Sequence, residues 1–178
     1  MALRAGANDV SGLAPGVYFV HLRGTRLLPL GLLGLFVVVT YTRYLTKAPL
    51  SCLIAPGLGF GPLMVMGTEF ALTGNYSMPG LVASLVPFFL VSDLLLLNQF
   101  PDVEADRRVG RLHLPIAVGR KASAWVYAAF LACTYVTVLV GVFLQLLPVA
   151  GLLALLTAPL AVPTARGALR CAESPAQL

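Results

Sequence analysis

The chain has 178 residues, of which 58% are hydrophobic and 11% are charged, and its formal net charge is +5 at pH 7. Soluble domains carry roughly 25% charged residues, so this composition excludes an ordinary soluble protein and predicts an integral membrane protein in a lipid bilayer. The positive charge is not arranged as a basic stripe with interleaved aromatic residues, so we expect no nucleic-acid partner.

The first half of the chain contains two apolar runs after a polar start. Glycine, proline and polar residues interrupt residues 1–26, which we expect to form a loop segment. The first apolar run begins at Leu27 and ends near Thr42, which is marginal for a helix that must cross ~30 Å of hydrocarbon. The second run, about 48–68, contains several prolines and glycines, which predict a kinked or partly broken membrane helix.

The third apolar run, Gly80–Leu97, is interrupted by Asp93. An acid within a membrane span is costly, and we favour a protonated or hydrogen-bonded carboxyl group packed between helices. After a charged segment, the uncharged stretch 122–165 is divided by Pro148 and Gly151 into two spans, about 122–146 and 149–165.

These runs predict an all-α fold, a polytopic membrane bundle of about five transmembrane helices. We expect the membrane domain to occupy residues 27–165, followed by a cytoplasmic tail at 166–178. With the loop at 98–121 in the cytoplasm, the segments on that side carry nine of the twelve Lys and Arg residues. The remaining three lie in the N-terminal segment on the opposite side. This asymmetry favours a cytoplasmic position for the 98–121 loop.

This loop, residues 98–121, is a charged island between apolar runs. Three of the seven acidic residues lie between 102 and 106, and five of the twelve basic residues follow between 107 and 121. Asn98, Asp102 and Asp106 are four residues apart, so a continuous helix would align them on one face, although Pro101 is expected to break that helix. Two carboxylates and an amide oxygen suit Mg²⁺, and the arginines that follow suit phosphate oxygens. The alternative is a solvated connector that carries only the basic residues of the cytoplasmic side.

The wider pattern around the charged island is more specific. It reads Asn98-x-x-x-Asp102-x-x-x-Asp106-x-x-x-Gly110, followed by Leu114-Pro115-x-x-x-Gly119-Arg120. This pattern resembles the second aspartate-rich motif of the UbiA superfamily of membrane prenyltransferases, with the closest likeness to the 1,4-dihydroxy-2-naphthoate polyprenyltransferase branch of menaquinone synthesis. Tyr41-Thr42 and the upstream run Gly61-Pro62-Leu63-Met64-Val65-Met66-Gly67-Thr68 are also similar to that branch.

The resemblance implies nine membrane helices around a central cavity, where two aspartate-rich motifs hold Mg²⁺ and bind an isoprenyl diphosphate. It also implies transfer of the isoprenyl group to an aromatic, dihydroxynaphthoate-like acceptor in quinone synthesis. Carried onto this chain, it makes Asp102 and Asp106 the expected catalytic residues and magnesium ligands, with Asn98 in support. Asn98, Arg107 and Lys47 are the expected contacts to the diphosphate.

Two further residues of the charged island have weaker expectations. Glu104 points to another helical face than Asp102 and Asp106, so we do not count it among the expected ligands. His113 stands where members of the resembled family often have threonine, so we expect it to have a local structural role.

The chain also departs from the resembled family. Asn8-Asp9 begins a first aspartate-rich motif, but Gly12 and Gly16 replace both later carboxylates. The predicted spans would correspond to helices four to eight of nine, so we expect a fragment, and the resemblance does not by itself imply activity of the isolated chain. A CDP-alcohol phosphotransferase is disfavoured because the D-G-x-x-A-R signature is missing. The alternative from another class is a non-catalytic transporter subunit or structural membrane partner, in which Asp93 would be the polar residue at mid-membrane.

Overall fold

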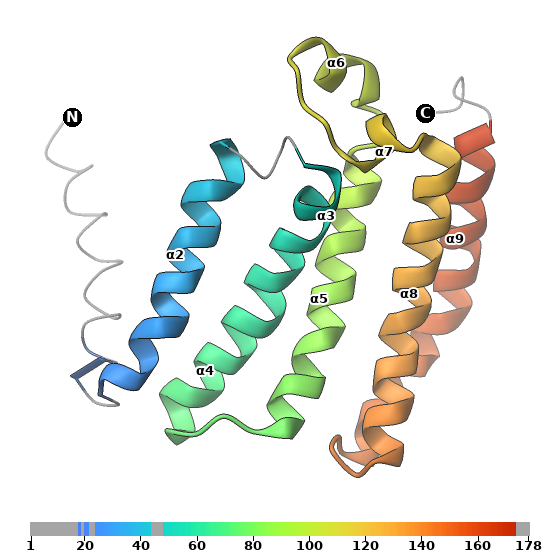
Figure 1. Cartoon of the computed structure of the whole chain (residues 1–178). Helices are drawn as coiled ribbons and strands as arrows, with labels where there is room; N and C mark the ends of the chain where they lie inside the picture. The colour runs from blue at the N-terminus through green and yellow to red at the C-terminus, as the bar shows by residue number, and fades with distance from the viewer. Residues whose placement is uncertain (1–17, 19, 22–23, 44–47, 174–178) are drawn as a thin grey trace, which may run out of the picture.

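The computed structural model describes residue 18 and residues 20–21, 24–43 and 48–173, and this part of the chain is helical without strands. The longer helices stand side by side in a row from α2 to α9, while the short α6 and α7 lie across one end (Figure 1). The predicted all-α bundle is confirmed. In chain order, the elements are η1 (Thr25–Leu27), α2 (Leu28–Arg43), α3 (Pro49–Leu58), η3 (Gly59–Leu63), α4 (Met64–Thr73), α5 (Met78–Asn98), α6 (Val103–Arg108), α7 (Leu114–Ala117), α8 (Arg120–Phe143), η4 (Val149–Thr157) and α9 (Ala158–Glu173).

Four helical segments in the described part of the chain are long and apolar enough to cross a membrane: Pro49–Thr73, Met78–Asn98, Arg120–Phe143 and Val149–Arg170. They correspond to the last four predicted spans. The first predicted span is also helical, but its apolar helix, Thr25–Thr40, is shorter than this length, in keeping with the marginal run in the sequence.

The second predicted span is one helical segment with a π-helical interruption. The π-helix, Gly59–Leu63, separates α3 from α4 and contains Pro62, which has no N–H to donate to the preceding turn. The predicted partly broken helix is therefore confirmed. On this segment Gly61 lies against α5 so closely that an added Cβ would be 2.6 Å from the carbonyl oxygen of Ser84.

The hydrophobic core lies directly beneath the charged island. Its buried members come from the ends of five helices and the turn after α5: Leu53, Leu96, Phe100, Leu114, Ala124, Tyr127 and Ala168. Phe100 and Leu114 belong to the island itself, and burial of each such side chain contributes about 1.5–3 kcal/mol. Val103, the first residue of α6, is also buried, so the island is attached to the bundle by its apolar residues.

The other end of α5 is joined to α4 by a polar contact. Ser77 is the N-cap of α5, and its hydroxyl oxygen accepts from the N–H of Gly80 at 3.0 Å. The Glu69 carboxylate of α4 accepts hydrogen bonds from both the hydroxyl and the backbone N–H of Ser77. This contact stabilises the turn between two antiparallel helices and leaves the opposite end of α5 at the charged island.

Candidate functional site

The break at Pro101 divides the aspartate motif between two helices. Helix α5 ends at Asn98, and after a turn α6 begins at Val103, so the predicted interruption is confirmed. The backbone N–H of Asp106 donates to the carbonyl of Asp102 at 2.8 Å, which places these two residues one helical turn apart. Asn98 lies on the preceding helix, and within the described part of the chain no side-chain hydrogen bond joins it to Asp102 or Asp106.

The C-terminus of α6 is closed by a Schellman motif. The N–H of Gly110 donates to the carbonyl of Arg107 at 3.2 Å, and the N–H of Arg111 donates to the carbonyl of Asp106 at 3.0 Å. Gly110 has a φ of 75°, a left-handed conformation that costs other residues about 1–2 kcal/mol. The turn at Gly110, four residues after Asp106, thus reverses the chain direction and places Arg111 next to the aspartate.

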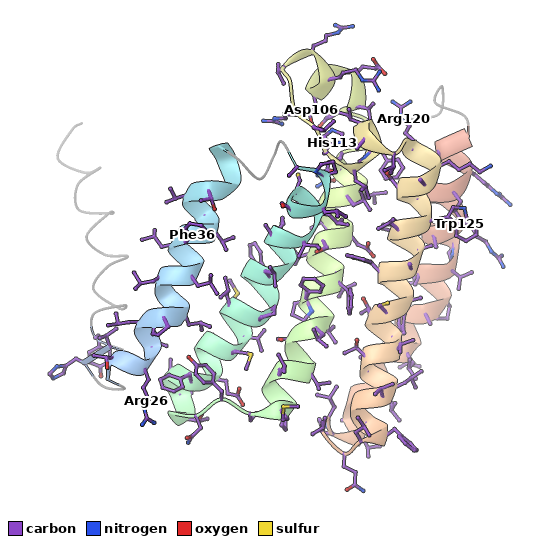
Figure 2. All side chains as sticks on the ribbon, in the orientation of Figure 1. Arg26, Phe36, Asp106, His113, Arg120 and Trp125 are labelled. Carbon is purple, nitrogen blue, oxygen red and sulfur yellow. The ribbon has the colours of Figure 1, made fainter. Side chains whose placement is uncertain are left out.

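Both oxygens of the Asp106 carboxylate have neighbours. Nη1 of Arg111 donates to Oδ1 at 3.0 Å, and Nε2 of His113 lies 3.1 Å from Oδ2. Neither ring nitrogen of His113 has a hydrogen bond of good geometry among the described residues, so this second contact is a close approach rather than a hydrogen bond. Asp106, His113 and Arg120 lie together at the same end of the bundle (Figure 2).

His113 is buried, whereas the four residues before it, 109–112, are exposed. It is the N-cap of α7, it is 2% exposed, and α7 packs against α3 and α8. Burial lowers the pKa of His113 from its ordinary value of about 6.5, because desolvation outweighs the nearby Asp106 carboxylate, which acts in the opposite direction. The lowered pKa favours the neutral ring, which supports the aspartate by packing contact rather than by opposite charge.

The other expected site residues are more exposed. Asp102 is exposed, and no ion pair involves it among the described residues. Arg107 lies 4.0 Å from Glu104, an exposed pair of the kind that contributes at most about 1 kcal/mol. Lys47 lies outside the described residues, as does the Asn8-Asp9 dipeptide.

The donor set suits Mg²⁺ that is shared with a phosphate ligand. No group of three or more His, Cys, Asp or Glu side chains that could hold a metal occurs in the described part of the chain. Mg²⁺ nevertheless commonly binds only one or two protein carboxylates when substrate phosphates complete its coordination shell. Asp102 and Asp106 therefore fit a metal–diphosphate site, provided that Oδ1 of Asp106 is released by Arg111.

Asp93 is buried in α5, away from the charged island. It is 3% exposed, and neither carboxylate oxygen has a hydrogen-bond partner in the described part of the chain. The neighbouring Ser92 hydroxyl is also buried without a partner. The expectation of an acid packed between helices is confirmed, but a hydrogen bond that would satisfy the carboxyl group is not observed among the described residues.

The sequence did not indicate the joint contact of Arg111 and His113 with Asp106. Arg111 was one of several basic residues in the island, and His113 was expected to have a local structural role. A signal was present in Gly110, because a glycine four residues after Asp106 is typical of a helix C-terminus that turns back on itself. The burial of His113 had no comparable signal.

The described part of the chain is thus an apolar helical bundle of membrane-spanning length with aspartates and arginines gathered at one end. The model of the UbiA prenyltransferase family matches residues 10–176, which is most of the chain. The chain therefore belongs to the UbiA prenyltransferase family, and the four helices of membrane-spanning length in its described part agree with an integral membrane protein.

A search of curated proteins finds the 1,4-dihydroxy-2-naphthoate octaprenyltransferase of Bacillus subtilis (strain 168), which is 29% identical over 129 residues. The matched region covers 69% of this chain and 40% of that relative. The chain thus spans less than half of the length of the relative. No solved structure gives a significant match.

Proposed function

We propose that the protein takes part in magnesium-dependent transfer of an isoprenyl group from an isoprenyl diphosphate to an aromatic acceptor. The observation that carries this proposal is a pair of aspartates at the polar end of a bundle that belongs to the UbiA prenyltransferase family: Asp102, the N-cap of α6, and Asp106, one turn further along that helix. We further propose a dihydroxynaphthoate-like acceptor and a role in quinone synthesis, which the name of the Bacillus subtilis relative supports.

In the proposed reaction, the allylic C–O bond of the donor breaks and its electron pair leaves with the diphosphate. A ring carbon of the acceptor forms the new C–C bond, and the ring then loses a proton. Asp102 and Asp106 would hold Mg²⁺, with the Asn98 side-chain oxygen as an additional ligand. The bound ion would supply positive charge to the departing diphosphate. Arg107 and Lys47 are the proposed additional contacts to the phosphate oxygens.

The apolar part of the donor also has a suitable surface. A groove of about 310 Å³ lies between α2, α3 and α5, and its lining includes Val37, Pro56, Phe60 and Leu95. These side chains have no charge to desolvate, so the groove suits an isoprenyl chain.

We also propose that the charged island faces the cytoplasm. In Figure 2, Arg26 lies at the end of the bundle opposite to Asp106 and Arg120. Most of the basic residues of the sequence lie on the side of the island, which supports a cytoplasmic position for that side.

Substitution of each aspartate tests the proposal. Asp102→Asn and Asp106→Asn should each lower Mg²⁺-dependent prenyl transfer in membranes that contain the protein by about 100-fold or more, since one contact that stabilises developing negative charge is commonly worth this factor. The same variants should lose binding of Mn²⁺ together with inorganic pyrophosphate, measured on the purified chain in detergent micelles.

The matched control is Glu104→Gln, which removes an exposed carboxylate from the same helix and should reduce transfer far less. If Asp102→Asn and Asp106→Asn change neither transfer nor metal–pyrophosphate binding relative to Glu104→Gln, the assignment of this site is wrong. Comparison of a dihydroxynaphthoate with a monocyclic hydroxybenzoate as acceptor tests the proposed acceptor class separately.

A further inference from the structure

The two oxygens of Asp106 face neighbours that differ in burial. His113, which lies 3.1 Å from Oδ2, has a side chain that is 3% exposed and is attached to the packed helix α7. Arg111, which lies 3.0 Å from Oδ1, has a side chain that is 58% exposed. The carboxylate therefore contacts a buried, packed side chain through Oδ2 and a solvent-exposed cation through Oδ1.

The backbone conformation after α6 places Arg111 beside the aspartate. The left-handed Gly110 and the 3.0 Å bond from the N–H of Arg111 to the carbonyl of Asp106 hold the backbone of Arg111 beside the carboxylate. The side chain of Arg111 is exposed. Among the described residues, its ion pair is with Asp106. Rotation of side-chain torsions is thus sufficient to release Oδ1, without movement of the loop.

We propose that Arg111 is a resident counter-ion, which occupies Oδ1 of Asp106 until Mg²⁺ and the diphosphate bind, and which then moves to the diphosphate. This inference rests on the proposed function, in which Asp106 is a magnesium ligand. A guanidinium and a divalent cation repel each other at one oxygen, whereas a guanidinium binds phosphate oxygens bidentately. His113 is the positioning residue that keeps the carboxylate oriented while Oδ1 changes partner.

The proposal predicts effects of opposite sign for one substitution. In Arg111→Ala, Oδ1 is free, so Mn²⁺ alone should bind about threefold to fivefold more tightly, the upper part of the range expected when a weak exposed pair no longer competes. Inorganic pyrophosphate, added with saturating Mn²⁺, should bind about tenfold more weakly because a charge-assisted contact is lost. Electron paramagnetic resonance of Mn²⁺ with the purified chain in detergent micelles measures both affinities. An arginine that only stabilised the loop would weaken both when removed.

Arg108→Ala is the matched control, because Arg108 is an exposed arginine of α6 without an ion pair among the described residues. Its removal lowers the local positive charge equally but leaves Oδ1 of Asp106 paired. We expect an affinity for Mn²⁺ alone within about twofold of that of the unsubstituted chain. The proposal is overturned if Arg111→Ala leaves the affinity for Mn²⁺ alone unchanged or weakens it, or if Arg108→Ala tightens it equally.

The positioning role of His113 has its own comparison. His113→Ala should weaken binding of Mn²⁺ alone by about tenfold, as is common when a neighbour of a metal ligand is removed, and His113→Gln should recover most of this loss. Equal loss in both variants, or no loss in either, contradicts the role.

Asp106→Asn separates failure of this inference from failure of the proposed function. If Asp106→Asn does not affect binding of Mn²⁺, both are wrong. If it abolishes that binding but Arg111→Ala does not strengthen it, only the counter-ion proposal is wrong.

Discussion

The contact between the π-helical segment and α5 can be tested with one added methyl group. Gly61→Ala would place its Cβ 2.6 Å from the carbonyl oxygen of Ser84 and 2.9 Å from the backbone nitrogen of Phe88, whereas ordinary contacts begin at 3.4 Å. Because both neighbours belong to the backbone, no side-chain rotation relieves the clash. The helices must separate by several tenths of an ångström.

Overpacking of this kind costs about 1–3 kcal/mol, and a backbone clash belongs in the upper part of the range. A loss of about 2 kcal/mol corresponds to a fall in Tm of about 4–8 °C for a chain of this size. Thermal unfolding in detergent, followed by circular dichroism at 222 nm, measures the change.

Gly59→Ala is a close control, since it lies two residues away in the same π-helix and an added Cβ would meet nothing within 4 Å. Its Tm should be unchanged or slightly higher, because alanine favours helix over glycine by up to about 1 kcal/mol. If Gly61→Ala and Gly59→Ala unfold at the same temperature, close approach of the backbones does not hold α5 in place.

Four other predictions concern single residues. Gly110→Ala should lower the free energy of unfolding by about 1–2 kcal/mol through its left-handed backbone, and an unchanged Tm would contradict the Schellman motif. Glu69→Ala should cost about 1–2 kcal/mol, since Ser77 loses two hydrogen bonds; a change below about 0.3 kcal/mol would show that this contact is not stabilising. Asp93→Leu should raise the free energy of unfolding by about 1–3 kcal/mol by removing a buried carboxyl group without a partner, and a decrease would reveal an interaction partner. Burial lowers the pKa of His113, so as the pH falls the unfolded chain binds a proton at this residue before the folded chain does. The contribution of His113 to the free energy of unfolding should therefore be complete above about pH 6.5 and decrease below it. His113→Gln should flatten that part of the pH profile of Tm.

Much of the helical arrangement could be predicted because it depends on local composition. The long apolar runs became membrane-length helices, and the helix break near Pro101 follows from its missing N–H and its fixed φ. The prolines and glycines of the second span likewise predicted an interrupted helix. The form of the interruption, a π-helix at Gly59–Leu63 that brings Gly61 against α5, depends on packing between two helices and could not be predicted from composition.

The site could be predicted only in part, for the same reason. The spacing of Asp102 and Asp106 placed them one turn apart, because Asp102 is the N-cap of the short helix that contains Asp106. The spacing alone did not show that Asn98 belongs to a different helix from Asp106, although Pro101 predicted a helix break between them. The roles proposed for Lys47 and Arg107 stay predictions, since Lys47 lies outside the described residues and Arg107 is exposed beside Glu104.

The sequence by itself determined that this protein is a helical membrane protein, and its charged island carried the motif of the UbiA prenyltransferase family. These properties are local, because hydrophobicity, helix-breaking residues and spacing within one turn act over a few neighbouring residues. Only the tertiary structure decided which groups face the carboxylate of Asp106. His113 is buried because α7 packs on α3 and α8, which are distant in sequence, and Arg111 reaches Oδ1 because Gly110 turns the chain back toward the aspartate.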